Sequence, residues 1–378
     1  MSIQVRIPQS SLVVLSSCPE KIHRVVRNVS LTQGDRDSHE FRYLRPKACA
    51  FLRSLKPMKI AFTPAIYEHA ARLIGRSPYE TSRDPDLLFA GHRAAWLEYH
   101  HTPIAVGIDI YNLEAEAYGA KIAVPDGNDI PAIHEPVFGS LDAALKVRPF
   151  DPARDGRLAM VIGVGQRLKK EFPQAEVRIP VAGPFSIAFN LVGISHLVEC
   201  AAERPEETRE FLWKLAENQG TFCKAVVDAG LDVAFFESAA APPLLSPRLF
   251  REVELPALKH AVAVAESQVR HPLPCIMGGD TFKIFDELMS TGTNFVVINP
   301  ETNQAAFVAR LRAEFPNVRV RVNMQPHIVI CNDRAAIYRE VDRILALADG
   351  YPNCVLGTGA LPYEAPPENV HLIREYVA

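Results

Sequence analysis

The stretch AGLDVAFFESAAAPPLLSPRLFREVELPALKHAV (229–262) has the form of a strand followed by a helix. Its apolar run VAFFES (233–238) is short enough for a buried strand and ends in Glu237 and Ser238. Ser246-Pro247 is a typical helix start, and the residues after it are numerous enough for a helix. The segment is therefore one strand–helix unit in which polar side chains follow the end of the strand.

Seven further runs of this kind occur: KIAFTP (59–64), IAVGID (104–109), VRIPVAG (177–183), LPCIMGGD (273–280), FVVIN (295–299), VRVRVN (318–323) and CVLGTG (354–359). Stretches long enough for helices separate them, which predicts parallel strands joined by helical crossovers. Eight such units indicate an α/β fold, the (β/α)8 TIM barrel, in which catalytic groups lie at the C-terminal ends of the strands. We therefore expect an enzyme whose chemistry is carried by residues that end these runs.

Residues 1–57 fit this pattern poorly because they mix basic, polar and apolar residues without a clear period. We interpret them as a partly ordered N-terminal extension and residues 58–378 as the barrel. A start codon placed too far upstream is an alternative, since Met58 immediately precedes the first strand. The longest connection, residues 110–176, is an insertion of the kind that commonly shapes a substrate pocket.

The composition limits the classes of partner. Of the 378 residues 48% are hydrophobic and 22% charged, which is ordinary for a globular protein. A formal charge of -3 gives no attraction to nucleic acid or to an anionic membrane, and no apolar run approaches the ~20 residues of a membrane span. The seven scattered cysteines favour reduced thiols. We expect a cytoplasmic protein that acts on a small-molecule substrate.

Two carboxylates at run ends are candidates for catalysis. Asp109 ends the second run, with Tyr111 just beyond it, and at a barrel mouth it could orient an N–H-bearing ligand or act as a general base. The alternative role is that of an anion at a helix N-terminus. Glu237 follows four apolar residues, so we expect it to enter the barrel mouth, where desolvation would raise its pKa. A structural salt bridge is the alternative for Glu237.

The fifth run contains two sulfur-bearing side chains. Cys275 and Met277 share one face of the strand, because side chains alternate. They could bind a soft metal, but two ligands do not complete a zinc site, and packing in the core is the alternative. Gly278 after them permits close backbone approach to a ligand, with Asp280 beside it.

The last two runs add further polar candidates. Asn323 ends the seventh run, and His327 lies just beyond it, either as a proton carrier at the mouth or as a structural histidine. The final run ends in a GTG turn around Thr358, whose backbone N–H groups could cradle a carboxylate or phosphate.

The order and spacing of five segments resemble the uroporphyrinogen decarboxylase superfamily, which contains the decarboxylases of haem synthesis and the methylcobamide:thiol methyltransferases. These segments are EAEAYGA (114–120), AGPFSIAFNLVG (182–193), the stretch 229–262, GGDT (278–281) and TGALPYEAPPENV (358–370). The resemblance runs from about Met58 to the C-terminus.

This chain matches the decarboxylases at some functional positions and differs from them at others. They grip substrate carboxylates with an arginine-rich motif of the RQAGRY type, whereas this chain reads FTPAIYEHAARLIGR (62–76) after its first run. They carry a histidine where this chain has Thr358. Asp109 matches their central aspartate, which holds the pyrrole N–H groups, and Ser238 matches a serine at their fourth strand.

The methyltransferase branch has an H-x-C-G motif and a further cysteine that together hold zinc, which activates the acceptor thiol. The corresponding residues here are Cys275, Met277 and Ala360, so the resemblance leaves Cys275 as a metal ligand, with Glu237 as a conceivable second one. The chain as a whole looks closer to this branch.

Three hypotheses follow. The first is methyl transfer from a corrinoid, either methylcobalamin or a corrinoid protein, to a small thiol or similar nucleophile. The second is a porphyrinogen decarboxylase that uses Asp109 without a cofactor, and the third is a non-catalytic ligand-binding barrel. The expected catalytic residues are Asp109, Glu237 and His327. The expected substrate-binding residues are Tyr111, Ser238, Gly278, Asp280, Asn323 and Thr358.

Overall fold

The computed structural model describes residues 4–5, 13–14 and 60–378. Strands β1 (Gln4–Val5) and β2 (Val13–Val14) pair in antiparallel fashion. The extension predicted for residues 1–57 otherwise lies outside the described residues. Residues Met58–Ala378 make up one compact unit, which contains the remaining described strands and the described helices.

Eight parallel strands form the sheet of this unit, and each of the eight predicted runs supplies one of them. They are β3 (Ala61–Ala65), β4 (Ile104–Ala105), β5 (Val177–Ala182), β6 (Asp232–Glu237), β7 (Cys275–Met277), β8 (Phe295–Ile298), β9 (Arg319–Asn323) and β10 (Cys354–Ala360). Their order in the sheet is β3-β10-β9-β8-β7-β6-β5-β4. No ladder joins β3 to β4 among the described residues, so the barrel is nearly closed. The predicted TIM barrel is confirmed.

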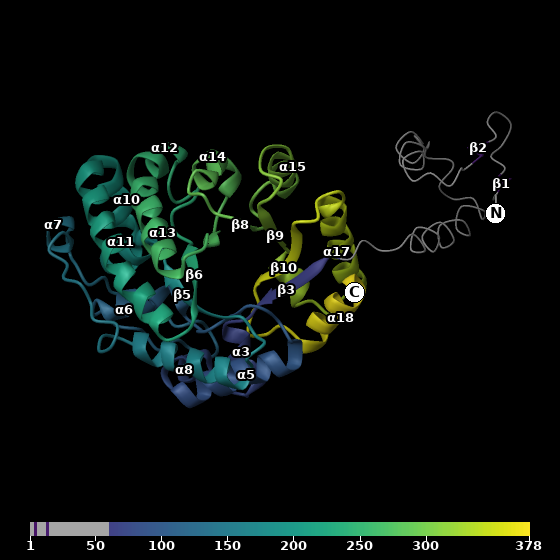
Figure 1. Ribbon diagram of the computed structural model, residues 1–378, viewed down its shortest axis with the longest axis horizontal. Helices are drawn as coiled ribbons and strands as arrows, with labels where there is room; N and C mark the ends of the chain where they lie inside the picture. The colour runs from purple at the N-terminus through teal and green to yellow at the C-terminus, as the bar shows by residue number, and fades with distance from the viewer. Residues whose placement is uncertain (1–3, 6–12, 15–59) are drawn as a thin grey trace. The chain divides into compact units, whose positions relative to one another are not determined.

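Helices surround the strands (Figure 1). The larger ones are α5 (Pro85–Tyr99), α8 (Leu158–Glu171), α9 (Pro184–Val192), α10 (Ile194–Glu203), α11 (Pro205–Asp228), α13 (Leu255–Val269), α15 (Gln304–Glu314), α17 (Arg334–Ala348) and α18 (Pro367–Val377). The short ones are α3 (Glu68–Leu73), α4 (Pro78–Arg83), η2 (Ile110–Asn112), α6 (Leu113–Ala117), α7 (Leu141–Ala144), α12 (Pro247–Leu249), η3 (Phe250–Glu254), η4 (Thr281–Ile284), α14 (Phe285–Met289) and α16 (Pro326–Val329).

Two helices that begin with proline are capped by the side chain just before it. The Asp84 side chain accepts hydrogen bonds from the N–H groups of Asp86 and Leu87 at the start of α5. The Ser246 hydroxyl accepts one from Leu249 N at 3.2 Å and so begins the passage α12–η3–α13. That passage follows β6 and completes the strand–helix unit expected from residues 229–262.

Each strand presents one set of side chains to the helices and the other to the barrel lumen. In β6, Val233 and Phe235 belong to the main core between sheet and helices. Ala234 and Phe236 belong to a separate lumen cluster with Tyr67 and other apolar residues. Phe236 packs edge-to-face against Tyr67, with ring centroids 6.3 Å apart, so an aromatic layer crosses the lumen near the C-terminal ends of the strands.

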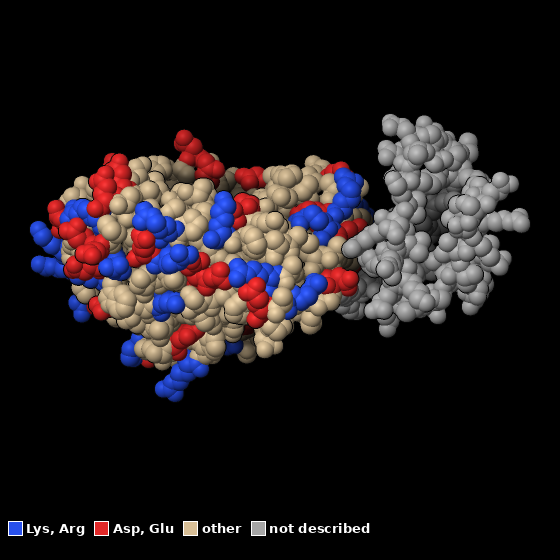
Figure 2. Space-filling model, turned by 90° about the horizontal axis from the view of Figure 1, so that it is seen from above, with Lys and Arg blue, Asp and Glu red and all other residues tan. Residues whose placement is uncertain are grey.

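Acidic and basic side chains are interspersed over the barrel face seen in Figure 2. No single described helix is long and apolar enough to cross a membrane. Helices α9 and α10 together are long and apolar enough to cross one, by length and composition alone, but the pair is bent by 114° between its two helices.

Candidate functional site

Asp109, which follows β4, is held by an arginine from the long connection. Arg157 Nη1 donates to Oδ1 at 2.9 Å and Nη2 donates to Oδ2 at 2.7 Å. Asn112 Nδ2 donates to Oδ2 at 3.2 Å. Only 3% of Asp109 is exposed. Both carboxylate oxygens are therefore engaged within the chain. Asp109 forms a structural salt bridge, a role predicted from the sequence as an alternative for Glu237 and not for Asp109.

The same arginine links Asp109 to a second carboxylate. Arg157 Nε donates to Glu116 Oε2 at 2.6 Å, and Arg83 pairs with the other oxygen of Glu116. Arg157 Nη1 also donates to the carbonyl of Ser82 at 2.7 Å. These contacts fasten the end of α4 and the start of α8 to the segment that follows β4.

Glu237 does not point into the barrel mouth, contrary to expectation. It shares the outward face of β6 with Val233 and Phe235, and its carboxylate accepts hydrogen bonds from Phe185 N at 3.2 Å and Ser186 N at 3.4 Å. The Ser186 hydroxyl donates to its other oxygen. Glu237 thus caps the N-terminus of α9 from a neighbouring strand.

A second buried glutamate lies beside this cap. Burial, followed by the neighbouring charge of Glu237, raises the pKa of Glu254 well above its ordinary value. Burial also raises the pKa of Glu237, while the hydrogen bond from Ser186 opposes that shift. The pair is consistent with one proton held by Glu254, which leaves Glu237 as the anion that α9 requires.

Cys275 lies next to these carboxyls, in the core between sheet and helices. Its side chain is buried, and burial raises the pKa of the thiol, with Glu237 and Glu254 adding to the shift. The thiolate that a metal would need is therefore disfavoured. Met277 is buried in the same core.

The residues present do not fit the zinc ion that the resemblance implies. Of the three corresponding positions, Cys275 carries a strong ligand, Met277 a thioether and Ala360 no donor. In the part of the chain that the structure describes, no group of three or more His, Cys, Asp or Glu side chains is arranged to hold a metal.

Other predicted residues lie at or just beyond the C-terminal ends of the strands. Tyr111 is exposed, and its ring packs edge-to-face against Phe236 at 6.2 Å. The Ser238 hydroxyl lies 3.4 Å from that of Ser186. Asn323 Nδ2 donates to Asn299 Oδ1 at 2.6 Å. Asn323 Oδ1 is buried and has no hydrogen-bond partner among the described residues.

The glycine pair beyond β7 is used for packing between backbones. A Cβ on Gly278 would lie 3.1 Å from the Ser238 carbonyl oxygen, and one on Gly279 would lie 2.7 Å from the Pro242 carbonyl oxygen. Gly279 also has φ +80°, which favours glycine. Asp280 comes next and pairs with Lys283 at 3.2 Å.

Two predicted candidates remain, Thr358 on β10 and His327 on α16. Thr358 is buried, and its hydroxyl accepts from Ala65 N at 3.3 Å and donates to Gly359 O at 2.7 Å, which ties β10 to β3. His327 is exposed on α16. Their predicted roles in binding and catalysis stay predictions.

Sequence reasoning missed Arg157, Ser186 and Glu254. Ser186 and Glu254 lie within the quoted segments 182–193 and 229–262, but neither ends an apolar run. Arg157 lies in the connection 110–176, where no periodic pattern marks it. Arg157 and Ser186 contact a run-end carboxylate from elements far away in sequence. Glu254 lies near Glu237 from the helical passage that follows β6. No local sequence signal reveals these contacts.

The model of the uroporphyrinogen decarboxylase (URO-D) family matches residues 47–378. The chain belongs to this family. The resemblance drawn from the five segments is therefore confirmed.

Among curated proteins, the methylcobamide:CoM methyltransferase MtaA of Methanosarcina barkeri (strain Fusaro / DSM 804) is 26% identical over 179 residues. The match covers 42% of this chain and 52% of that protein, so it spans about half of the relative's length.

Two solved structures share the fold. A methyltransferase from Methanosarcina mazei has a TM-score of 0.73 at 18% identity, over 88% of this chain and 98% of that one. A putative vitamin-B12 independent methionine synthase from Listeria monocytogenes has a TM-score of 0.51 at 10% identity, over 85% and 97%. At these identities the likeness extends to the barrel alone.

Proposed function

We propose that this URO-D family protein transfers a methyl group from a methylcorrinoid to a small thiol or similar nucleophile. The observation that carries the proposal is the Asp109–Arg157 pair. A decarboxylase would need the Asp109 carboxylate to hold pyrrole N–H groups, but Arg157 and Asn112 already occupy both of its oxygens. The methylcobamide-dependent relative supports the methyltransferase branch.

The segment after β3 supports the same choice. The decarboxylases share an arginine-rich motif after the first strand. At that place in this chain, α3 begins with Glu68. Burial raises the pKa of the Glu68 carboxyl to about 7. A glutamate at this position supplies no cation to bind the carboxylates of uroporphyrinogen. A porphyrinogen with eight carboxylates is therefore a poor fit to this segment.

The proposed acceptor site is the group at the C-terminal ends of β6 and β9. The Tyr111 and Ser238 hydroxyls and the unpartnered Asn323 Oδ1 can position a small polar acceptor. Glu237 and Cys275 are buried on the helix side of the sheet, so they would support this site without touching substrate. In the transfer, the acceptor lone pair takes the methyl group, the carbon–metal electron pair stays with the corrinoid, and a thiol acceptor releases its proton.

The test uses the full chain with methylcobalamin and a series of small thiols, including coenzyme M. Loss of the methylcorrinoid spectrum and formation of the methyl thioether, identified by mass spectrometry, are the expected results. Tyr111→Phe and Ser238→Ala should each lower the rate about tenfold or more, while exposed Arg154→Met leaves it unchanged. If no thiol is methylated and uroporphyrinogen loses carboxylates in a parallel assay, the proposal is wrong.

A further inference from the structure

A cavity of about 620 Å³ occupies the lumen on the other side of the aromatic layer from Tyr111 and Ser238. Its rim is formed by residues that precede strands: residues 100–103 before β4, residues 271–272 and Pro274 before β7, and Asn294 before β8. The cavity therefore opens at the N-terminal ends of the strands. Its volume is typical of small-molecule sites, which measure ~300–1,000 Å³.

Basic side chains dominate the charged lining of this cavity. Among the described residues that line it, the charged ones are Glu176, Arg178, Arg319, Arg321 and Arg374. Arg178 is neutralised within the chain, because it pairs with Glu176 and, at 3.3 Å, with Asp232. The other arginines leave the lumen with an excess of positive charge.

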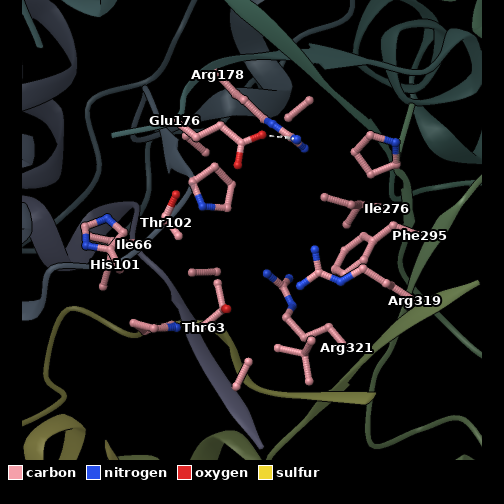
Figure 3. A pocket seen from close by; sticks show the side chains of 18 of the residues that line it. Thr63, Ile66, His101, Thr102, Glu176, Arg178, Ile276, Phe295, Arg319 and Arg321 are labelled. Atoms are coloured by element: carbon pink, nitrogen blue, oxygen red, sulfur yellow. Dashed lines mark hydrogen bonds and ion pairs between the residues drawn. The ribbon is translucent and has the colours of Figure 1, made fainter. Parts of the chain in front are cut away.

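Two arginines of β9 point into the cavity (Figure 3). Arg319 and Arg321 are two positions apart, so strand alternation places both side chains on the lumen face. The Arg319 guanidinium lies 5.7 Å from the centroid of the Phe295 ring. Among the described residues neither arginine makes an ion pair with a carboxylate, and Arg321 Nε is buried without a hydrogen-bond partner.

The charge on Arg321 lacks compensation from its surroundings. Burial lowers the pKa of Arg321, while the nearby Tyr67 and Tyr111 oppose that shift. Burial in turn raises the pKa of the Tyr67 phenol, which therefore stays neutral and cannot act as a counterion. A guanidinium remains protonated in proteins, and an unpaired buried charge is costly, so the lumen favours entry of an anion.

We propose that this cavity binds a small organic anion with two or more negative charges, as phosphate or carboxylate groups, through Arg319 and Arg321. Guanidinium groups match both kinds of oxyanion with paired, charge-assisted hydrogen bonds. Ala234, Ile276 and Phe295 also line the cavity and offer an apolar wall for the carbon skeleton. This anion site adds a second ligand to the proposed methyl transfer and lies across the aromatic layer from it.

The experiment is calorimetric titration of the full chain in a low-salt buffer that contains no phosphate or carboxylate. Glycerol 3-phosphate and citrate serve as separate probes, which distinguish a phosphate ligand from a polycarboxylate. At least one should bind, and Arg321→Gln should weaken that binding about tenfold or more. Arg248→Gln on α12 removes the same charge from an exposed pair and should leave affinity unchanged.

A second measurement excludes a purely structural role for Arg321. Without added anion, Arg321→Gln should melt at the wild-type temperature or above it, because it removes an uncompensated charge. Failure of both probes to bind the wild-type protein would overturn the proposal. So would wild-type affinity in Arg321→Gln, or a lower melting temperature of that variant in the absence of anion.

Discussion

Arg157 holds both carboxylate oxygens of Asp109, although 48 positions separate the two residues in sequence. The pair is buried, and the same guanidinium also reaches Glu116 and the Ser82 carbonyl. The long connection between β4 and β5, which the sequence predicts to shape a pocket, supplies this cation. The buried ion pair between Asp109 and Arg157 therefore holds the segment after β4 against the start of α8.

Arg157→Met should be strongly destabilising, because it leaves the buried Asp109 carboxylate without its cation. Loss of one partner of a buried pair costs about 3–5 kcal/mol in the free energy of unfolding. Arg154→Met is the matched control, since Arg154 pairs with Asp151 while its side chain is 84% exposed. An exposed pair contributes about 0–1 kcal/mol. Similar losses of stability in the two variants, measured by urea unfolding, would contradict this role of Arg157.

Glu114 should make the protein less stable as pH rises above 4.5. Burial raises its pKa from 4.5 to about 8, although Ala182 N donates to its carboxyl at 2.7 Å. Between these pH values the folded protein keeps a proton that the unfolded chain has lost, so the free energy of unfolding falls with pH. The slope contributed by one such group is at most about 1.4 kcal/mol per pH unit.

Glu114→Gln tests this pH dependence, because a glutamine resembles the protonated acid at every pH. The variant should show a flatter decline in stability from pH 5 to 8 and should exceed the wild type at pH 8. Glu135→Gln, at an exposed position, should retain the wild-type slope. Unfolding by urea at several pH values measures the slopes, and equal slopes for Glu114→Gln and wild type would refute the prediction.

The strands can be predicted from sequence, but the direction of their side chains largely cannot. Eight runs indicate the barrel because parallel strands covered on both faces are continuously apolar. The same continuity hides which residues face the lumen, so the run pattern places Glu237 at the mouth although it faces the helices. In β9 the alternation VRVRVN does mark the face, since Arg319 and Arg321 stand opposite three buried or half-buried valines. Both arginines lie inside the run, so a list of candidates drawn from the residues that end the runs omits them.

Glu237 and Glu254 should respond differently to the same substitution. Glu254→Gln replaces a protonated acid with a neutral amide and should change stability by less than about 1 kcal/mol at pH 7. Glu237→Gln turns one acceptor oxygen into a donor that faces the N–H groups of α9, and should cost about 1–3 kcal/mol. A larger loss in Glu254→Gln, measured by urea unfolding, would place the anion on Glu254 instead.

Cys275 should be unreactive in the folded protein. Its thiol is buried and its pKa is raised by burial, so the thiolate needed for alkylation is scarce. Of the five cysteines that the structure describes, Cys331 is half-buried and the others are buried, so Cys331 should be the first of the five to react with iodoacetamide. Mass spectrometry of native and urea-unfolded protein would locate the labels. Zinc content should be the same in the wild type and in Cys275→Ala, and loss of stoichiometric zinc from that variant would show that Cys275 does bind metal.

Gly183 separates β5 from α9 at the point where the Glu237 carboxyl passes. A Cβ on this glycine would lie 2.6 Å from Glu237 Cδ and 2.8 Å from Glu237 Cβ, closer than real Cβ contacts. Gly183→Ala must displace the carboxylate from the N–H groups of Phe185 and Ser186 and should cost about 2–4 kcal/mol. The displacement should also expose Glu237 to water and bring its titration toward that of an ordinary glutamate.

Gly163→Ala in α8 is the matched control, because a Cβ there meets no atom within 4 Å. In a helix interior the change from glycine to alanine should stabilise the protein by about 0.5–1 kcal/mol. The two variants add the same methyl group, so opposite signs in urea unfolding isolate the contact with Glu237. If Gly183→Ala is as stable as Gly163→Ala, the carboxylate does not cap α9 in the way that these contacts require.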